Sequence, residues 1–325
     1  HVLARHRRQG GGQAGAAVIA YDIVFSEPDR TSPARIAAQL ERTGADAATL
    51  SRLRGLPDND DVQAGRLTRN RVVLGYFLLN DRKGADLVPK AGMAVAGSPP
   101  GRAVPHFARA VESLPQFDAA ASGKGFVSLS AQGDGIVRQL PLIAWQGGQL
   151  VPSLSLEALR AAQGGGAIIV RTSDASGELP GQPGDVVSLK AGDFEIPATA
   201  SGNLWLYLTK PEARRVIPAW KVLSGAVAPQ ELDGMIVLVG AGAAGLRDLI
   251  STPLRERELG VVAHAQALEQ MILGRNLIRP DWASGLERLL VLVLGLSLAL
   301  LLPRMGAARG AVLGMFAIAA MLAGS

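Results

Sequence analysis

Residues 235–254 read MIVLVGAGAAGLRDLISTPL, and this stretch decides between two interpretations of the chain. Its apolar start predicts a buried strand, and Gly240, Gly242 and Gly245 then follow the GxGxxG spacing of a dinucleotide-binding turn. Such a turn also requires a helix beginning at the third glycine and an acidic residue roughly 20 positions later, which holds the ribose. Pro253 interrupts the helix, and an alanine occupies the acidic position. The glycines therefore predict a tight turn close to a sheet with no cofactor, and a membrane-attached dinucleotide-dependent enzyme is the alternative.

Outward from this stretch, apolar runs of strand length alternate with short helical segments. This alternation predicts an α/β (mixed α+β) fold with a central mixed sheet. Strands are predicted from Ala16 to Phe25, from Arg71 to Leu79, from Met235 to Val239, and as short runs between Ala167 and Leu208. Helices are predicted from Ser32 to Thr43 with Gly44 as the stop, from Ser153 to Ala162 (short and amphipathic), from Pro218 to Ser224, and from Gly260 to Leu273.

Turn-forming residues predict where the chain leaves these elements. The segment Pro57–Gly65 is polar and acidic and Lys83–Pro105 is rich in glycine and proline, so both are predicted to be loops. Between the strand-like runs 125–132 and 136–146 lies Gly133-Asp134-Gly135, which predicts a β-hairpin insertion.

The carboxyl end of the chain is strongly apolar. The run LLVLVLGLSLALLL, from Leu289 to Leu302, has 14 residues without a charge. A membrane span needs roughly 20 apolar residues, and extension back to Trp282 supplies that length. We therefore predict a transmembrane helix at 282–303 and a second, truncated one at 309–325, with the arginines between them favouring a cytoplasmic turn. Two core helices of a soluble protein are the alternative.

Composition argues against several classes of protein. Lys plus Arg exceed Asp plus Glu only by 33 to 28, and aromatic residues are 4% of the chain, which is too little for nucleic-acid binding. Cysteine is absent, which excludes disulfides and thiolate sites. The four histidines lack ligand spacing, and the cluster Asp58, Asp60 and Asp61 lacks the later ligands of a calcium loop. We predict no catalytic residue, no metal and no nucleic-acid partner.

Four segments carry a more specific signal: YDIVFSEPDR (21–30), DGIVRQLPL (134–142), VLVGAGAAGLRDLISTPL (237–254) and GVVAHAQALEQMILGRNLIRPDW (260–282). Together they resemble the type-2 CHASE domain, an extracellular sensory family associated with cyclases and histidine kinases. Its members usually carry a leading membrane helix, this domain, further membrane helices and a cytoplasmic signalling domain. The resemblance implies a sensor domain at 1–280 whose first strand and leading membrane helix are missing.

The resemblance also implies a function. The chain would be the periplasmic ligand-sensing input module of a receptor in the bacterial inner membrane. It would control an adenylate or guanylate cyclase, or a histidine kinase, that this chain lacks. Expected partners are a small ligand or an envelope protein, membrane lipid, and a second copy in a homodimer. A non-signalling envelope scaffold is the alternative.

Twelve positions are implied as family-motif, ligand or coupling residues: Asp22, Glu27, Asp29, Asp134, Arg138, Gly240, Gly245, Arg247, Asp248, Thr252, Pro253 and His264. Among them, Arg247 and Asp248 are predicted to be paired near the end of the sheet, since an unpaired buried charge is costly. A lone histidine on a core helix is more often structural than a ligand, so His264 is predicted to be hydrogen-bonded. The segment 260–282, which joins the last core helix to the apolar end, is predicted to transmit the signal.

Overall fold

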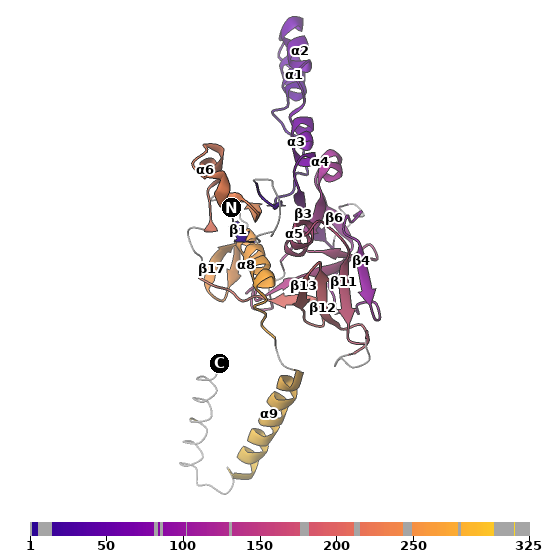
Figure 1. Cartoon of the computed structure of the whole chain (residues 1–325), viewed down its shortest axis with the longest axis vertical. Coiled ribbons are helices and arrows are strands. Elements are labelled where there is room, and N and C mark those ends of the chain that lie inside the picture. Colours follow the sequence, from indigo (N-terminus) through magenta and orange to yellow (C-terminus); the bar gives the residue numbers. More distant parts are fainter. Residues whose placement is uncertain are drawn as a thin grey trace. The chain divides into compact units, whose positions relative to one another are not determined.

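The computed structural model describes residues 2–5, 15–80, 84, 87–101, 103–129, 132–175, 182–210, 215–242, 249–278, 281–301 and 315. The chain divides into two compact units, His1–Leu277 and Ile278–Ser325. Each unit is described by itself below, and Figure 1 labels the elements of both.

A mixed sheet lies at the centre of the first unit, which confirms the predicted fold class. Its parallel core has the order β15 (Met235–Gly240), β2 (Val18–Asp22), β3 (Val72–Leu79) and β7 (Gly123–Phe126). Antiparallel partners extend this core: β1 (Val2–Arg5) pairs with β15, and β6 (Arg109–Val111) pairs with the end of β3. Parallel strands covered on both faces are continuous apolar runs, which is why the sequence predicted β2, β3 and β15 correctly.

Two helices pack on this sheet and on each other. Helix α5 (Leu154–Ala162) contacts β2, β3 and β7, whereas α8 (Gly260–Leu273) contacts β1 and β15. Ser153 caps α5, because its hydroxyl accepts the Leu156 N–H at 3.4 Å. Every residue of α5 is buried. The sequence therefore predicted the helix, but not its burial on all sides.

A second sheet contains the predicted short strands of the segment 167–208 that precede residue 198. Its order is β13 (Phe194–Pro197), β12 (Val186–Ala191), β11 (Ile168–Thr172) and β4 (Met93–Ala96). The strand β4 lies inside the glycine- and proline-rich segment predicted to be a loop, so that prediction is wrong at these positions. Its backbone pairs in parallel with the distant β11, and no local pattern reveals such a partner.

The predicted hairpin around residues 133–135 is wrong. The turn itself forms, with the Gly135 N–H donating to Gln132 O at 2.8 Å. However, the run before it pairs through β7 with β3, and the run after it pairs through β8 (Gln139–Pro141) with β14 (Asn203–Trp205). The strands on either side of the turn are thus recruited by different partners.

A hairpin does form shortly afterwards. Strands β9 (Ile143–Gln146) and β10 (Gln149–Pro152) pair antiparallel, and β5 (His106–Phe107) pairs in parallel with β9. The connecting Gly147 and Gly148 have φ of 56° and 80°, which the favoured two-residue hairpin turn requires.

Three helices project from the sheet as an arm: α1 (Pro33–Arg42), α2 (Ala47–Arg54) and α3 (Asn59–Thr68) (Figure 1). The short helix α4 (Pro115–Ala120) contacts α3. The sequence predicted α1 correctly but did not predict α2.

The prediction of a loop at Pro57–Gly65 is wrong, because α3 begins there. Asp58 caps the helix by accepting the Asp60 N–H at 2.8 Å. Asp60 and Asp61 lie in the first turn, where negative charge is favourable at a helix N-terminus. The acidic cluster that indicated a solvated loop is therefore a helix start.

The remaining elements of the first unit are α6 (Ala219–Leu223), α7 (Pro229–Leu232), β16 (Leu249–Thr252) and β17 (Arg255–Leu259). The predicted helices at 218–224 and 260–273 are confirmed as α6 and α8.

The described part of the second unit is chiefly α9 (Asp281–Leu301), and most of its described leucine and valine side chains are exposed. Among the described residues, no helix combines the length and the apolar character needed to cross a membrane. The membrane spans at 282–303 and 309–325 stay predictions, and the second lies outside the described residues except for Met315.

Candidate functional site

Gly240, the last residue of β15, lies where the sheet comes close to the start of α8. A Cβ atom at Gly240 would lie 2.5 Å from the Cβ of Val261, a distance that real Cβ contacts do not show. Gly240 also lies beside Asp22 in the register of the parallel sheet. The prediction of glycines at a close approach is therefore supported at Gly240. Gly245, Arg247 and Asp248 lie outside the described residues.

His264 lies on the inner face of α8 and has no exposed surface. Its Nε2 lies 3.3 Å from Val127 O and its Nδ1 lies 2.7 Å from Ser155 Oγ. Because a carbonyl can only accept, Nε2 carries the proton, and the Ser155 hydroxyl then donates to Nδ1. Burial lowers the pKa of His264 to about 4, so the ring is neutral near pH 7. This histidine joins α8 to α5 and to the end of β7.

Two glutamines on the same helix hold an extended segment of the chain. Gln270 Oε1 accepts the Tyr207 N–H at 2.8 Å, and its Nε2 donates to Trp205 O at 2.8 Å. Gln266 Oε1 accepts the Thr209 N–H at 2.9 Å, and its Nε2 donates to Thr209 O at 3.3 Å. Since residues four apart lie on one face of a helix, the two amides satisfy the backbone of 205–209 as a neighbouring strand would.

An open pocket of about 180 Å³ lies between this segment and the carboxyl-terminal half of α8. An ion pair between Arg215 and Glu269 lines one part of it, and both side chains are about one-third exposed. Arg275, Leu273 and the ring of Tyr207 also line the pocket. A cavity of roughly 150 Å³ can hold a benzene molecule, so this pocket has room for a small ligand. Its lining offers both charges and an apolar surface.

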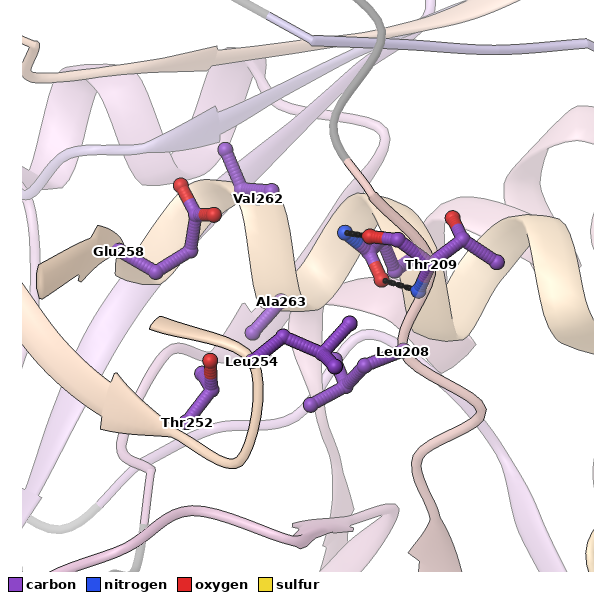
Figure 2. A pocket seen from close by; sticks show the side chains of 8 residues that line it. Leu208, Thr209, Thr252, Leu254, Glu258, Val262 and Ala263 are labelled. Carbon is purple, nitrogen blue, oxygen red and sulfur yellow. Dashed lines mark hydrogen bonds between the residues drawn. The ribbon is translucent and has the colours of Figure 1, made fainter. Parts of the chain in front are cut away.

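A second, much smaller cavity lies further toward the start of α8 (Figure 2). Its volume is about 10 Å³, close to the minimum that one water requires. Thr252, Leu254, Glu258 and Val262 line it. Of the two cavities, the larger pocket is therefore the candidate ligand site.

The family-motif residues of β16 are structural parts of this region. The Thr252 hydroxyl accepts the Arg255 N–H at 3.1 Å, which closes the turn that contains Pro253. Strand β16 is joined in turn to the loop before β8, since Val137 N donates to Ser251 O at 2.8 Å. In that loop Arg138 forms an ion pair with Asp134 at 2.8 Å. The structure thus joins the loop that carries Asp134 and Arg138 to the strand that carries Thr252, although the two segments lie far apart in the sequence.

The two remaining motif residues belong to the base of the arm instead. Glu27 forms an exposed ion pair with Arg30 at 2.8 Å. Asp29 accepts the Thr31 N–H at 2.8 Å and a hydrogen bond from Asn59 Nδ2 at 2.9 Å, and these bonds lower its pKa. Both acidic residues therefore order the chain between β2 and α1.

The sequence analysis missed the buried charges of the core. Glu157 and Arg160 form a bidentate pair on α5, with N–O distances of 2.7 and 2.6 Å. Their spacing of three residues in an apolar helix was the available signal, since such a spacing places both on one face. A second group, around Lys124, is described below. Within the described residues, no grouping of histidine and acidic side chains is arranged to hold a metal ion.

A model of the CHASE2 domain family matches residues 12–302, which is most of the chain. No curated protein and no solved structure gives a significant match.

Proposed function

The chain belongs to the CHASE2 domain family, whose members are extracellular sensory domains of signalling receptors, and we propose that it is the ligand-sensing input module of a bacterial transmembrane receptor. A sensory domain is not catalytic. In agreement with this role, the glycine that suggested a dinucleotide site, Gly240, makes its close approach to Val261 of α8.

The observation that carries the proposal is the pocket along α8. A small ligand there would contact α8 through Glu269 and Leu273, and the facing segment through Tyr207. The same segment is held on α8 by Gln266 and Gln270. A ligand that binds one arrangement of these two elements more tightly than another shifts the population toward it. Because α8 is the last helix before the second unit, such a shift reaches the segment that leaves the sensor.

The lining of the pocket indicates the character of the ligand. Arg215 and Arg275 present guanidinium groups, and Glu269 presents a carboxylate that already pairs with Arg215. Charged groups of this kind orient a small polar molecule, whereas Leu273 and Tyr207 accommodate an apolar part. We therefore favour a small charged or zwitterionic ligand over an envelope protein.

We further propose that the chain is attached to the bacterial inner membrane, with the sensor on the periplasmic side and as a homodimer. The uncharged run Leu289–Leu302 and the apolar residues 310–325 support attachment, since an apolar surface of this extent is unfavourable in water. The effector would be a nucleotide cyclase or a histidine kinase elsewhere in the protein. A non-signalling scaffold stays the alternative.

An insertion experiment in the full-length receptor tests this function. Two or three flexible residues inserted after Arg279 should abolish regulation of the effector and leave the melting temperature of the sensor unchanged. The same residues inserted after Asp193, in the exposed turn between β12 and β13, should leave both unchanged. Regulation that survives the first insertion would show that α8 does not transmit the signal, and a full-length protein without any effector would favour the scaffold.

A further inference from the structure

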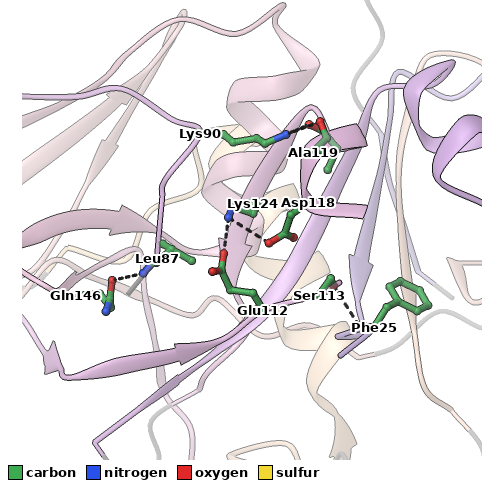
Figure 3. A network of polar contacts seen from close by, with 10 residues as sticks. Phe25, Leu87, Lys90, Glu112, Ser113, Asp118, Ala119, Lys124 and Gln146 are labelled. Atoms are coloured by element: carbon green, nitrogen blue, oxygen red, sulfur yellow. Dashed lines mark hydrogen bonds and ion pairs between the residues drawn. The ribbon is translucent and has the colours of Figure 1, made fainter. Parts of the chain in front are cut away.

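A buried lysine in the central sheet is shared by two carboxylates. Lys124 lies on β7 with its side chain 6% exposed, and it forms ion pairs with Glu112, just after β6, and with Asp118 of α4. The Lys124 Nζ to Asp118 Oδ2 distance is 3.3 Å, and both carboxylates are 17% exposed (Figure 3). One ammonium group thus faces two negative charges in a site that excludes most water.

The other charged groups around this site have their own partners. The Lys90 ammonium donates to Ala119 O at 3.1 Å and to Ala121 O, so it caps the end of α4 (Figure 3). On the α5 side, Glu157 is paired with Arg160. These groups leave Glu112 and Asp118 to share Lys124.

A polar atom without a partner lies within electrostatic reach of Glu112. The Tyr76 side chain on β3 is 1% exposed, and its hydroxyl has no hydrogen-bond partner among the described residues. Burial, and then the negative charges of Glu157 and Glu112, raise the pKa of Tyr76 well above its usual value. The Tyr76 hydroxyl therefore stays protonated and adds no charge to the site.

We propose that Glu112 and Asp118 form a proton-binding site in the sensor, which takes up one proton as the surrounding medium becomes acidic. Two carboxylates that share one site hold a proton between them more tightly than either does alone, because the first negative charge opposes the second. The proton comes from water, and no covalent bond other than O–H forms. Lys124 then neutralises the single remaining carboxylate.

The pKa of Asp118 agrees with this geometry. Burial raises the pKa of Asp118 to about 6, Lys124 opposes the rise, and Glu112 adds to it. Protonation removes the charge with which Asp118 ties α4 to Lys124. Helix α4 contacts α3 at the base of the arm, so proton uptake changes the stability of the packing between the arm and the sheet. The site would give a periplasmic sensor a response to acid, and that physiological meaning rests on the proposed function.

The substitution Asp118→Asn tests the site, with melting temperatures measured against pH for the full chain in detergent. The asparagine imitates the neutral carboxyl group. Because the folded-state pKa of Asp118 is raised above the unfolded value of 3.8, its contribution to stability is complete below about pH 4 and is lost as the pH rises through about 6. We expect the melting temperature of the wild type to fall relative to that of the variant between pH 4 and about pH 7.

The wild type has to be compared with the variant, because the contribution of His264 to stability changes with pH in the opposite direction over the same pH range. Asp193→Asn, in the exposed turn between β12 and β13, is the matched control and should follow the wild type at every pH. Parallel melting curves for wild type and Asp118→Asn would overturn the proposal.

A second measurement does not depend on how the variant folds. In the wild type, carbon-13 NMR of the side-chain carboxyl groups should show an aspartate that titrates near pH 6, and Glu112→Gln should move this titration to lower pH. If every aspartate has titrated by about pH 5, there is no proton-binding site of this kind. Both experiments use the chain without its effector, so their outcome is independent of whether the chain serves a receptor.

Discussion

Helices α8 and α9 follow each other in the chain and are both rich in apolar residues, yet their side chains meet opposite conditions. Ten of the α8 residues are buried, and its polar side chains His264, Gln266 and Gln270 are hydrogen-bonded to other parts of the first unit. By contrast, most of the described leucines and valines of α9 are exposed, with values such as 64% for Leu292. The hydrogen-bonded polar residues of α8 show that this helix is packed within the first unit. The exposed apolar side chains of α9 instead favour contact with lipid or another chain.

The largest expected effect tests this difference by removing α9. A chain that ends at Leu277 should stay monodisperse in plain buffer and unfold cooperatively, because the first unit contains the hydrophobic core. The whole chain should require detergent. Size-exclusion chromatography with light scattering measures both. A whole chain that is monomeric without detergent would contradict the proposed membrane attachment and remove the contrast between the helices.

The next effect concerns how closely α8 approaches the sheet. Gly240→Ala should destabilise the first unit by about 3 kcal/mol, since its Cβ would overlap with Val261 and overpacking typically costs about 1–3 kcal/mol. Gly285→Ala is the matched control on α9, where a Cβ meets nothing within 4 Å. It should leave the unfolding of the first unit unchanged in urea titrations. Equal effects of the two substitutions would show that α8 is not tightly held.

A smaller effect is expected from the buried histidine. His264→Ala should cost about 2–3 kcal/mol, from a cavity and from two lost hydrogen bonds. Its folded-state pKa of about 4 lies below the usual 6.5, so the wild-type stability from this group is complete above pH 6.5 and lost as the pH falls toward 4. The variant should therefore lose less stability than the wild type on acidification. His106→Ala, at an exposed histidine, is the control.

The smallest expected effect is the difference in stability between substitutions of the two glutamines of α8. Gln270→Ala should cost about 1–2 kcal/mol, because it leaves the backbone groups of Tyr207 and Trp205 without partners. Gln266→Ala should cost less, since its bonds are exposed to water. Hydrogen exchange at the Tyr207 amide should accelerate in the first variant only. An unchanged rate would mean that α8 does not hold the segment beside the pocket.

The elements that the sequence predicted correctly depend on local patterns. Apolar runs identified β2, β3 and β15, and the helix α8 was predicted with the bounds that the structure shows. Predictions were wrong where one sequence pattern is compatible with two local structures. The acidic residues after Asp58 indicate a solvated loop or a helix start, and the hydrogen bond from Asp60 N decides for the helix. The hairpin predicted around residues 133–135 was wrong for a related reason. The turn residues are compatible with a hairpin, but they do not determine which strands pair.

By itself, the sequence determined the family resemblance, the mixed α/β class, the close approach at Gly240 and the structural character of His264. Only the tertiary structure decided where the functional features lie. Val127 and His264 are 137 positions apart, Thr209 and Gln266 are 57 apart, and Glu112, just after β6, forms an ion pair with Lys124 of β7. No periodicity encodes such contacts, because burial and pairing of these polar groups depend on which elements pack together. The pocket beside α8 and the proton-binding pair are therefore properties of the fold.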